Sequence, residues 1–138
     1  MKRVYVAGAY SADNVIDVLD NTRRGMKKGT EVLLTGYSPF VPWFDFHFQL
    51  MLKETQTLTV QDYYDYSIAW LKVSDYILVL PNSENSKGTQ EEIRIAKELG
   101  IPVVTKIESI DLIEKGKANE GRDNRIGTPE PSQGRRSS

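Results

Sequence analysis

The 138-residue sequence predicts an α/β fold in which helices cover both faces of a parallel sheet of four to five strands. The segments 3–9, 75–81 and 101–106 are short, continuous apolar runs, which are typical of strands buried on both faces. Between them lie segments whose apolar residues recur at helical spacing. The resulting βαβαβαβ order indicates a three-layer sandwich of the flavodoxin- or Rossmann-like kind.

The first part of the chain predicts a strand, a helix and a second strand. "RVYVAGA" (3–9) is the first strand, and the helix after it has Asp13 or Ser11 available to cap its start. Gly25 and Gly29 weaken this helix intrinsically, and we interpret them as positions where its backbone lies close to the sheet. "SPFVPW" (38–43) is the second strand, followed by the aromatic-rich connection "FDFHFQLML". In the helix between these two strands, the residues at helical spacing are Val15, Ile16, Leu19, Thr22, Met26 and Leu33.

The second part predicts two further strand–helix pairs. Residues 60–73 form a helix with Tyr64, Ile68 and Leu71 on one stripe. Asp75 precedes the strand "DYILVLP" (75–81), and we interpret it as a structural residue that holds a neighbouring backbone or loop. After a polar loop and a helix come the strand "IPVVTK" (101–106) and a short terminal helix that ends at Gly116. Parallel sheets bind ligands outside the carboxyl ends of their strands, so the loops after residues 8, 43 and 81 form the predicted ligand-binding rim.

Charge divides the chain into a folded domain, 1–115, and a basic tail, 116–138. The formal net charge is −1, but residues 115–138 carry a net charge of +3, which leaves the body acidic. An acidic body argues against a nucleic-acid polymer as a partner, and the tail lacks the interleaved aromatic residues of a binding surface. Its composition predicts disorder.

Composition also excludes several kinds of site. The chain has no cysteine and one histidine, His47, which has no partners at metal-ligand spacing. We therefore expect no disulfide, no metal site and no cofactor. The first apolar stretch is too short and too quickly polar for a signal peptide or a membrane span, which predicts a cytoplasmic protein with no membrane partner.

Two adjacent carboxylates at the start of the helix after residue 81 can be separated by helix geometry. Glu92 shares a face with Ala96 and Leu99 and should point inward, whereas Glu91 lines up with Arg94 and mostly faces water. An inward carboxylate at the ligand rim could act on a small molecule. The alternative is a capping box, since Thr89 and Glu92 are three residues apart.

Four stretches carry a resemblance to a known family. "VYVAGAY", "PFVP", "SDYILVLP" and "SKGTQEEIRIAKELGIPVV" resemble the nucleoside 2-deoxyribosyltransferase superfamily, which also contains the 2'-deoxynucleoside 5'-phosphate N-hydrolases. The resemblance runs from about Val4 to Val104, and its most specific element is the spacing of Gly88, Glu92 and Ala96. It implies that Glu92 is the nucleophile of a two-step displacement at C1', with a glycosyl-enzyme ester as intermediate. The implied partner is a small-molecule nucleoside or nucleotide.

The sequence departs from that family at two places. Members usually carry an acidic residue eight positions before Asp75, where this chain has Ser67; Asp65 lies nearby and is our substrate-binding candidate. Ser86 matches the serine that the nucleotide hydrolases of the family place six residues before the nucleophile, but the first loop lacks their arginine and has Ser11 instead. The residue that activates the leaving base therefore stays unassigned.

The remaining candidates come from the predicted rim. "SKGT" is either a flexible turn or a loop whose amides and Ser86 hydroxyl hold a phosphate at a helix N-terminus. Tyr10 is the second catalytic candidate beside Glu92, since it could contact a ribose or the nucleophile; the alternative is a packing residue. Trp43, with its aromatic neighbours, could stack on a base or form a subunit interface. The substrate-binding candidates are Gly8, Ala9, Ser11, Trp43, Asp65, Ser86, Gly88 and Thr89.

The predicted function is cleavage or transfer of the N-glycosidic bond of a 2'-deoxynucleoside or its 5'-monophosphate. Two alternatives stay open: a non-catalytic nucleotide-binding sensor of the same fold, and a phosphoribohydrolase of the lysine-decarboxylase-like type. The second has a Gly-Thr-x-x-Glu motif like that at Gly88, but normally with a doubled glycine that is missing here. The aromatic segments "WFDFHF" and "YYDYSIAW" further predict a homo-oligomer.

Overall fold

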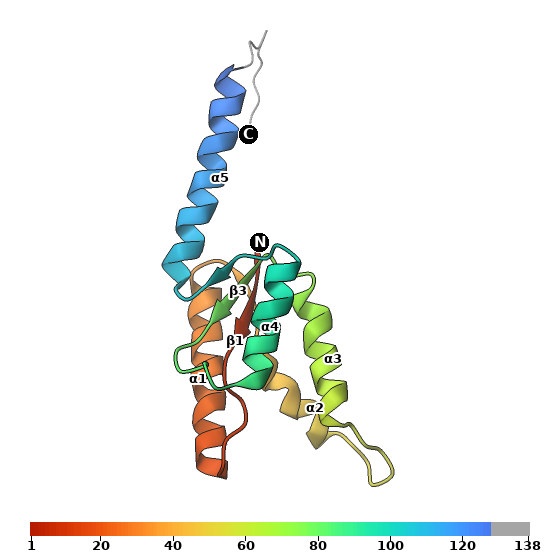
Figure 1. The fold of residues 1–138 in the computed structure, drawn as a ribbon. Coiled ribbons are helices and arrows are strands. Elements are labelled where there is room, and N and C mark those ends of the chain that lie inside the picture. The colour runs from red at the N-terminus through yellow and green to blue at the C-terminus, as the bar shows by residue number, and fades with distance from the viewer. Residues whose placement is uncertain (128–138) are drawn as a thin grey trace. The chain divides into compact units, whose positions relative to one another are not determined.

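The computed structural model describes residues 1–127, with the backbone alone for residues 122–127, and divides them into two units (Figure 1). The first unit is Met1–Ile107, which contains the whole sheet. The second begins at Glu108 and contains most of one helix. Within the described residues, no helix is both long and apolar enough to cross a membrane.

A four-stranded parallel sheet forms the centre of the first unit. Its strands are β1 (Arg3–Ala7), β2 (Ser38–Phe40), β3 (Tyr76–Val79) and β4 (Val103–Val104), in the order β2-β1-β3-β4. Tyr5 of β1 lies opposite Phe40 on one side and Ile77 on the other. The predicted fold class is confirmed. The direction in which strands are added reverses between β1 and β3, and such a switch point is where open α/β sheets bind ligands.

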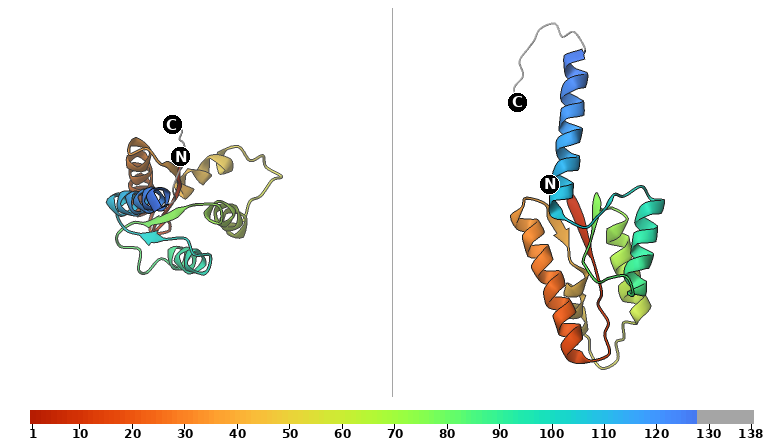
Figure 2. Two further views of the ribbon diagram at one scale, coloured as in Figure 1. Left: turned by 90° about the horizontal axis from the view of Figure 1, so that it is seen from above. Right: turned by 60° about the vertical axis from the view of Figure 1, so that its left-hand side comes forward.

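Helices cover both faces of the sheet. Helix α1 (Val15–Leu34) lies on one face, while α3 (Val60–Leu71) and α4 (Lys87–Glu98) lie on the other, as the right-hand view of Figure 2 shows. The core between the strands and α3–α4 contains Tyr5, Ala7, Ile68, Leu71, Ile77 and Ala96. Because strand side chains alternate between faces, Tyr5 and Ala7 both point toward α3 and α4.

Helix α1 differs from its prediction at its cap and on its buried face. Its N-cap is Asn14, which accepts a hydrogen bond from the Asp17 amide, so neither Asp13 nor Ser11 caps it. The buried positions are Asn21, Gly25, Gly29 and Val32, whereas the apolar residues expected to face the core are largely exposed. Those exposed residues are Val15, Ile16, Leu19 and Leu33.

The two glycines of α1 explain its close packing. A Cβ added at Gly25 would lie 2.2 Å from the Trp43 ring, and one at Gly29 would lie 2.4 Å from Val41. The predicted close approach is therefore confirmed, with the segment after β2 as the neighbour. Trp43 is 1% exposed in consequence.

The predicted second strand, 38–43, is too long. Strand β2 stops at Phe40, because Pro42 begins the 3-10 helix η1 (Pro42–Asp45), which continues into the short helix α2 (Phe46–Leu50). Proline favours the first position of a helix and cannot donate to a strand ladder. Asp75 has the predicted structural role, since its carboxylate accepts a 2.7 Å hydrogen bond from the Arg3 amide.

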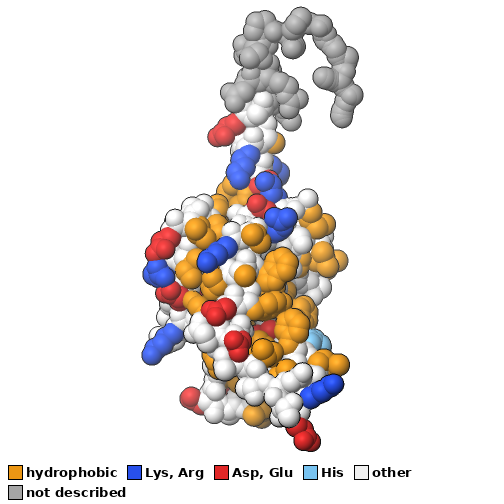
Figure 3. All heavy atoms as spheres, turned by 90° about the vertical axis from the view of Figure 1, so that its right-hand side faces the viewer, with side chains coloured by type: hydrophobic (Ala, Val, Ile, Leu, Met, Phe, Trp, Pro, Cys, Tyr) orange, Lys and Arg blue, Asp and Glu red, His pale blue; other side chains and the backbone are white. Residues whose placement is uncertain are grey.

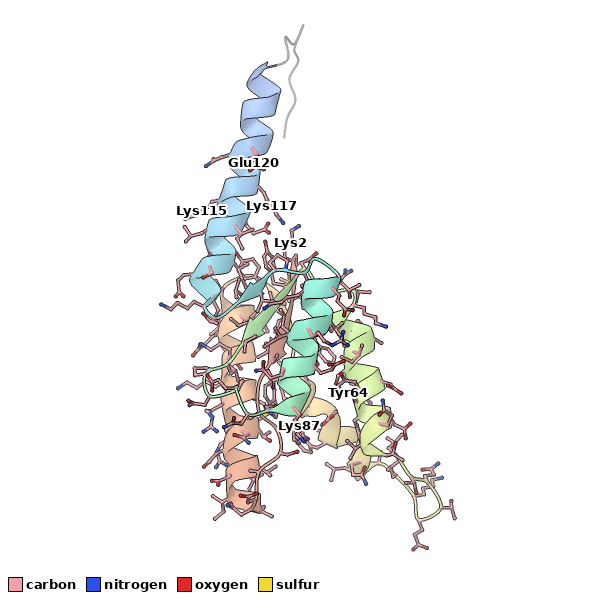
Figure 4. All side chains as sticks on the ribbon, in the orientation of Figure 1. Lys2, Tyr64, Lys87, Lys115, Lys117 and Glu120 are labelled. Atoms are coloured by element: carbon pink, nitrogen blue, oxygen red, sulfur yellow. The ribbon has the colours of Figure 1, made fainter. Side chains whose placement is uncertain are left out.

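The second unit corrects the predicted end of the last helix. Helix α5 (Ile107–Gly127) continues through Gly116 for another eleven residues instead of stopping there. A glycine inside a helix costs only about 1 kcal/mol, and Lys117 pairs with Glu114 within the helix. Figure 4 labels Lys115, Lys117 and Glu120 on α5. Residues 116–127 of the predicted disordered tail are thus helical, and residues 128–138 lie outside the described residues.

Candidate active site

A cavity of about 790 Å³ lies at the carboxyl ends of the strands. Its walls come from the loops after β1 and β3, the segment after β2, helix α3 and the first turns of α4. Figure 4 labels one residue from each helical wall, Tyr64 on α3 and Lys87 at the start of α4. Its volume is within the range of small-molecule sites.

Glu92 is the most perturbed carboxyl group of the cavity. Its Oε2 accepts a 2.5 Å hydrogen bond from the hydroxyl of Tyr5, which reaches it from the buried strand β1. Burial of the carboxyl raises the pKa of Glu92 to about 7, although the Tyr5 bond acts in the opposite direction. Burial raises the pKa of Tyr5 as well, so the shared proton stays on the phenol. Both the acid and the carboxylate form of Glu92 are therefore accessible near neutral pH.

The capping-box interpretation of Glu92 is wrong. The N-cap of α4 is Ser86, whose Oγ accepts hydrogen bonds from the Thr89 amide at 3.3 Å and the Thr89 hydroxyl at 2.8 Å. Thr89 is consequently the third residue of the helix, and Glu92 lies beyond the first turn, where no orphan amide needs it.

The predicted difference between the two glutamates is confirmed. Glu92 and Ala96 face inward, while the Glu91 carboxylate pairs with Arg94, whose Nε donates to it at 2.8 Å. This ion pair lowers the pKa of Glu91. Leu99 is the exception, at 52% exposed, because α4 ends at Glu98 and Leu99 is already its C-cap.

A second polar group, formed by Tyr10 and Asp45, lines the cavity. The Tyr10 hydroxyl donates a 2.9 Å hydrogen bond to Asp45 Oδ1, and the Tyr10 ring stacks on Trp43 with 6.5 Å between centroids. Trp43 Nε1 donates to the Ala9 carbonyl, and Asn21 Nδ2 donates to the Tyr10 carbonyl, both at 3.2 Å. Burial raises the pKa of Asp45, and the Tyr10 bond partly offsets this. These hydrogen bonds hold the loop after β1 against the segment after β2 and against helix α1.

Tyr64 contributes a polar atom without a partner. Its hydroxyl is buried and makes no hydrogen bond in the part of the chain that the structure describes. Burial, followed by the charges of Glu91 and Glu92, raises its pKa. Buried polar atoms are rarely left unsatisfied, and Tyr64 lines the cavity. Its hydroxyl is therefore an unsatisfied polar atom buried in the cavity wall.

Nine of the ten predicted site residues lie in the cavity wall, and Asp65 does not. Asp65 is exposed on α3 and accepts a 2.8 Å hydrogen bond from Gln61, one turn earlier on the same helix. Two residues further along α3, Ser67 is buried and does reach the cavity. Two positions along a helix correspond to about 200° of rotation, which explains why one faces the cavity and the other water. The nine are Gly8, Ala9, Tyr10, Ser11, Trp43, Ser86, Gly88, Thr89 and Glu92.

Tyr5 and Asp45 are polar residues of the site that the sequence did not predict. In the sequence, Tyr5 looks like one more residue of an apolar strand. Its role as the hydrogen-bond donor to Glu92 depends on a contact with α4, 87 residues later. Strand alternation could have indicated that it shares a face with Ala7. Asp45 lies two residues after Trp43 in an aromatic run, and a lone carboxylate there was a usable signal.

Charged groups in the cavity wall are few. Among the described residues that line it, Asp45 and Glu92 are acidic and Lys87 is basic. No group of three or more metal-ligating side chains lies close enough to hold an ion in the region that the structure covers.

Solved structures of other proteins resemble this one to different degrees. A 2-deoxyribosyltransferase from the psychrotolerant bacterium Bacillus psychrosaccharolyticus has a similar structure, with a TM-score of 0.56 and 17% sequence identity over 76% of this chain and 75% of that one. A conserved protein from Enterococcus faecalis V583 aligns at a TM-score of 0.47 and 16% identity, over 75% of this chain and 61% of that one. A search of curated proteins found no match. The family model described as "Domain of unknown function (DUF4406)" matches residues 2–105, and the chain therefore belongs to that family.

Proposed function

We propose that this protein cleaves or transfers the N-glycosidic bond of a 2'-deoxynucleoside or its 5'-monophosphate, with Glu92 as the nucleophile. The observation that carries the proposal is the Glu92 carboxyl itself, held by Tyr5 in the wall of a cavity at the switch point of the sheet. The similar fold of a 2-deoxyribosyltransferase supports the same class of reaction. A cavity of about 790 Å³ has room for a nucleotide.

The first chemical step is displacement at the anomeric carbon. An ionised Glu92 oxygen attacks C1' of the sugar, the C1'–N bond breaks with its electron pair going to the base, and a glycosyl ester of Glu92 forms. Water or a second base then attacks C1' and releases Glu92. Two displacements restore the original configuration at C1'.

Tyr5 is the positioning residue for this step. Its hydroxyl donates a hydrogen bond to Glu92 Oε2 and so orients the carboxyl group. Oε1 is the oxygen that is left to attack C1'. The hydrogen bond also favours the ionised form of Glu92, the form that a nucleophile needs. Because Tyr5 is fully buried on β1, the carboxyl is held by the rigid sheet and not by a loop.

The start of α4 is the proposed 5'-phosphate site. Ser86 accepts two hydrogen bonds through Oγ, so its own proton is still available to a ligand oxygen. The amides of Lys87 and Gly88 belong to the first turn, where a helix favours an anion, and the Lys87 side chain lies at the same wall. Together they could bind a phosphate without an arginine.

Base release from a panel of deoxynucleosides and their monophosphates, measured by chromatography, tests the proposal. We expect Glu92→Ala to abolish release, because no other group occupies its position, and the matched variant Glu91→Ala to retain it. Near-normal release by Glu92→Ala would overturn the assignment. Ligand binding by the wild type without any release would instead favour the sensor alternative.

A further inference from the structure

Departure of the base from C1' requires more than a nucleophile. A purine or pyrimidine that leaves as an anion is a poor leaving group, so cleavage is faster when an acid delivers a proton to the base in the transition state. Among the described residues lining the cavity, two carry carboxyl groups, Asp45 and Glu92. If Glu92 is the nucleophile, Asp45 is the carboxyl that remains for this role.

The position of Asp45 is well defined. It is the last residue of η1, two residues after the fully buried Trp43. Its Oδ1 accepts the Tyr10 hydroxyl at 2.9 Å, and Tyr10 is itself stacked on Trp43. The described part of the chain gives Oδ2 no partner, so this oxygen is available to a ligand.

The surroundings of Asp45 favour its protonated form. Its neighbours are the phenols of Tyr10, from the loop after β1, and of Tyr63 and Tyr66, from α3. No Lys or Arg pairs with it among the described residues, and burial raises its pKa. The nearest histidine in sequence, His47, uses Nδ1 to contact the Phe44 carbonyl. A base that displaces water from the cavity would raise the Asp45 pKa further.

We infer that Asp45, positioned by Tyr10, is the acid that protonates the base as it leaves C1'. The inference rests on the proposed function. As Glu92 forms its bond to C1', the C1'–N bond breaks, and the Asp45 Oδ2 proton moves to a ring nitrogen of the base. A neutral base, a glycosyl ester and the Asp45 carboxylate result. In the second step, the carboxylate removes the proton from the attacking water or base, which restores the acid.

A comparison of two leaving groups tests the inference. The first substrate is the deoxynucleoside or deoxynucleotide that the wild type cleaves best; the second is the same sugar carrying 4-nitrophenolate, which leaves without a proton. We expect Asp45→Asn to lower kcat/KM for the first by about 100-fold or more and to leave the second within a few-fold. Asp65→Asn, an exposed carboxylate of α3, is the matched control and should change neither.

Tyr10→Phe supplies a second, independent readout. Removing the Tyr10 hydroxyl takes away a bond that lowers the Asp45 pKa. The ratio of kcat/KM at high pH to kcat/KM at low pH should therefore rise in Tyr10→Phe, and Asp45→Asn should lose the decline at high pH. An unchanged ratio in Tyr10→Phe contradicts the inference, even if Asp45→Asn fails to fold.

The outcomes separate the inference from the proposed function. If the wild type cleaves both substrates, and Asp45→Asn lowers both equally or neither, Asp45 is not the acid, although the function stands. If the wild type releases neither leaving group, both the function and the inference fall.

Discussion

Glu92 should make the folded protein less stable as the pH rises, and Glu92→Gln should remove this effect. The carboxyl has a pKa of about 7 in the folded protein, against 4.5 as its ordinary value. Below pH 4.5 it is protonated in both the folded and the unfolded chain, so it costs nothing. Above pH 7 it is ionised in both, and the folded chain bears the cost of a buried charge.

The magnitude follows from the shift in pKa. A shift from 4.5 to about 7, at about 1.4 kcal/mol per pH unit, corresponds to about 3 kcal/mol. Part of this cost is already present at pH 5, where the unfolded carboxyl is mostly ionised, so we expect a loss of about 2 kcal/mol in the free energy of unfolding between pH 5 and pH 8. In Glu92→Gln the side-chain amide oxygen can still accept the Tyr5 bond, so the hydrogen bond is retained.

Denaturant unfolding of the wild type and Glu92→Gln at both pH values measures the effect. We expect Glu92→Gln to be more stable than the wild type at pH 8, and the two to be similar at pH 5. Glu91→Gln is the control, since Glu91 is paired with Arg94 at the surface and has a lowered pKa. Equal pH dependence in the wild type and Glu92→Gln would refute the view that the Glu92 carboxyl is desolvated.

Three further predictions concern the phosphate, the assembly and the last helix. The ratio of kcat/KM for a deoxynucleotide to that for its nucleoside should exceed one and fall in Ser86→Ala; a ratio at or below about one, unchanged by the substitution, would argue against a phosphate site. Light scattering should give a mass above the 15.7 kDa of the monomer. The reason is exposed apolar surface: Val15 and Ile16 are mostly exposed, and hydrophobic side chains gather on the face that carries α2 and α3 (Figure 3). A fully active monomer would count against an oligomer. Truncation after Gly116 should leave the melting temperature nearly unchanged, since residues 117–121 are exposed, and a large drop would contradict that expectation.

The sheet was predictable from the sequence because its strands are continuous apolar runs, whereas the helix faces were less so. The Tyr76–Val79 strand can be recognised from its own apolar residues, without knowledge of the strands that pair with it. In α1, by contrast, the buried face is made of small and polar residues that fit against the bulky Trp43. A hydrophobicity pattern cannot indicate a helix face that packs through glycine, since the apolar bulk comes from the neighbouring segment.

The candidate site was predictable as far as single residues and local spacing allow. The inward direction of Glu92 follows from helix periodicity, and the rim follows from the strand order. The bonds from Tyr5 to Glu92 and from Tyr10 to Asp45 join residues 87 and 35 positions apart, and only the folded chain brings them together. Ser86 as the cap in place of Thr89 was missed because both residue types cap helices well.

A covalent intermediate on Glu92 can be sought directly by mass spectrometry. The protein is mixed with the substrate from which it releases most base, quenched in acid during turnover, digested and analysed. We expect the peptide that contains Glu92 to gain the mass of a deoxyribosyl or deoxyribosyl phosphate group, and the same peptide of Glu92→Gln to stay unmodified. Base release with the adduct on a different residue would contradict the nucleophilic role of Glu92.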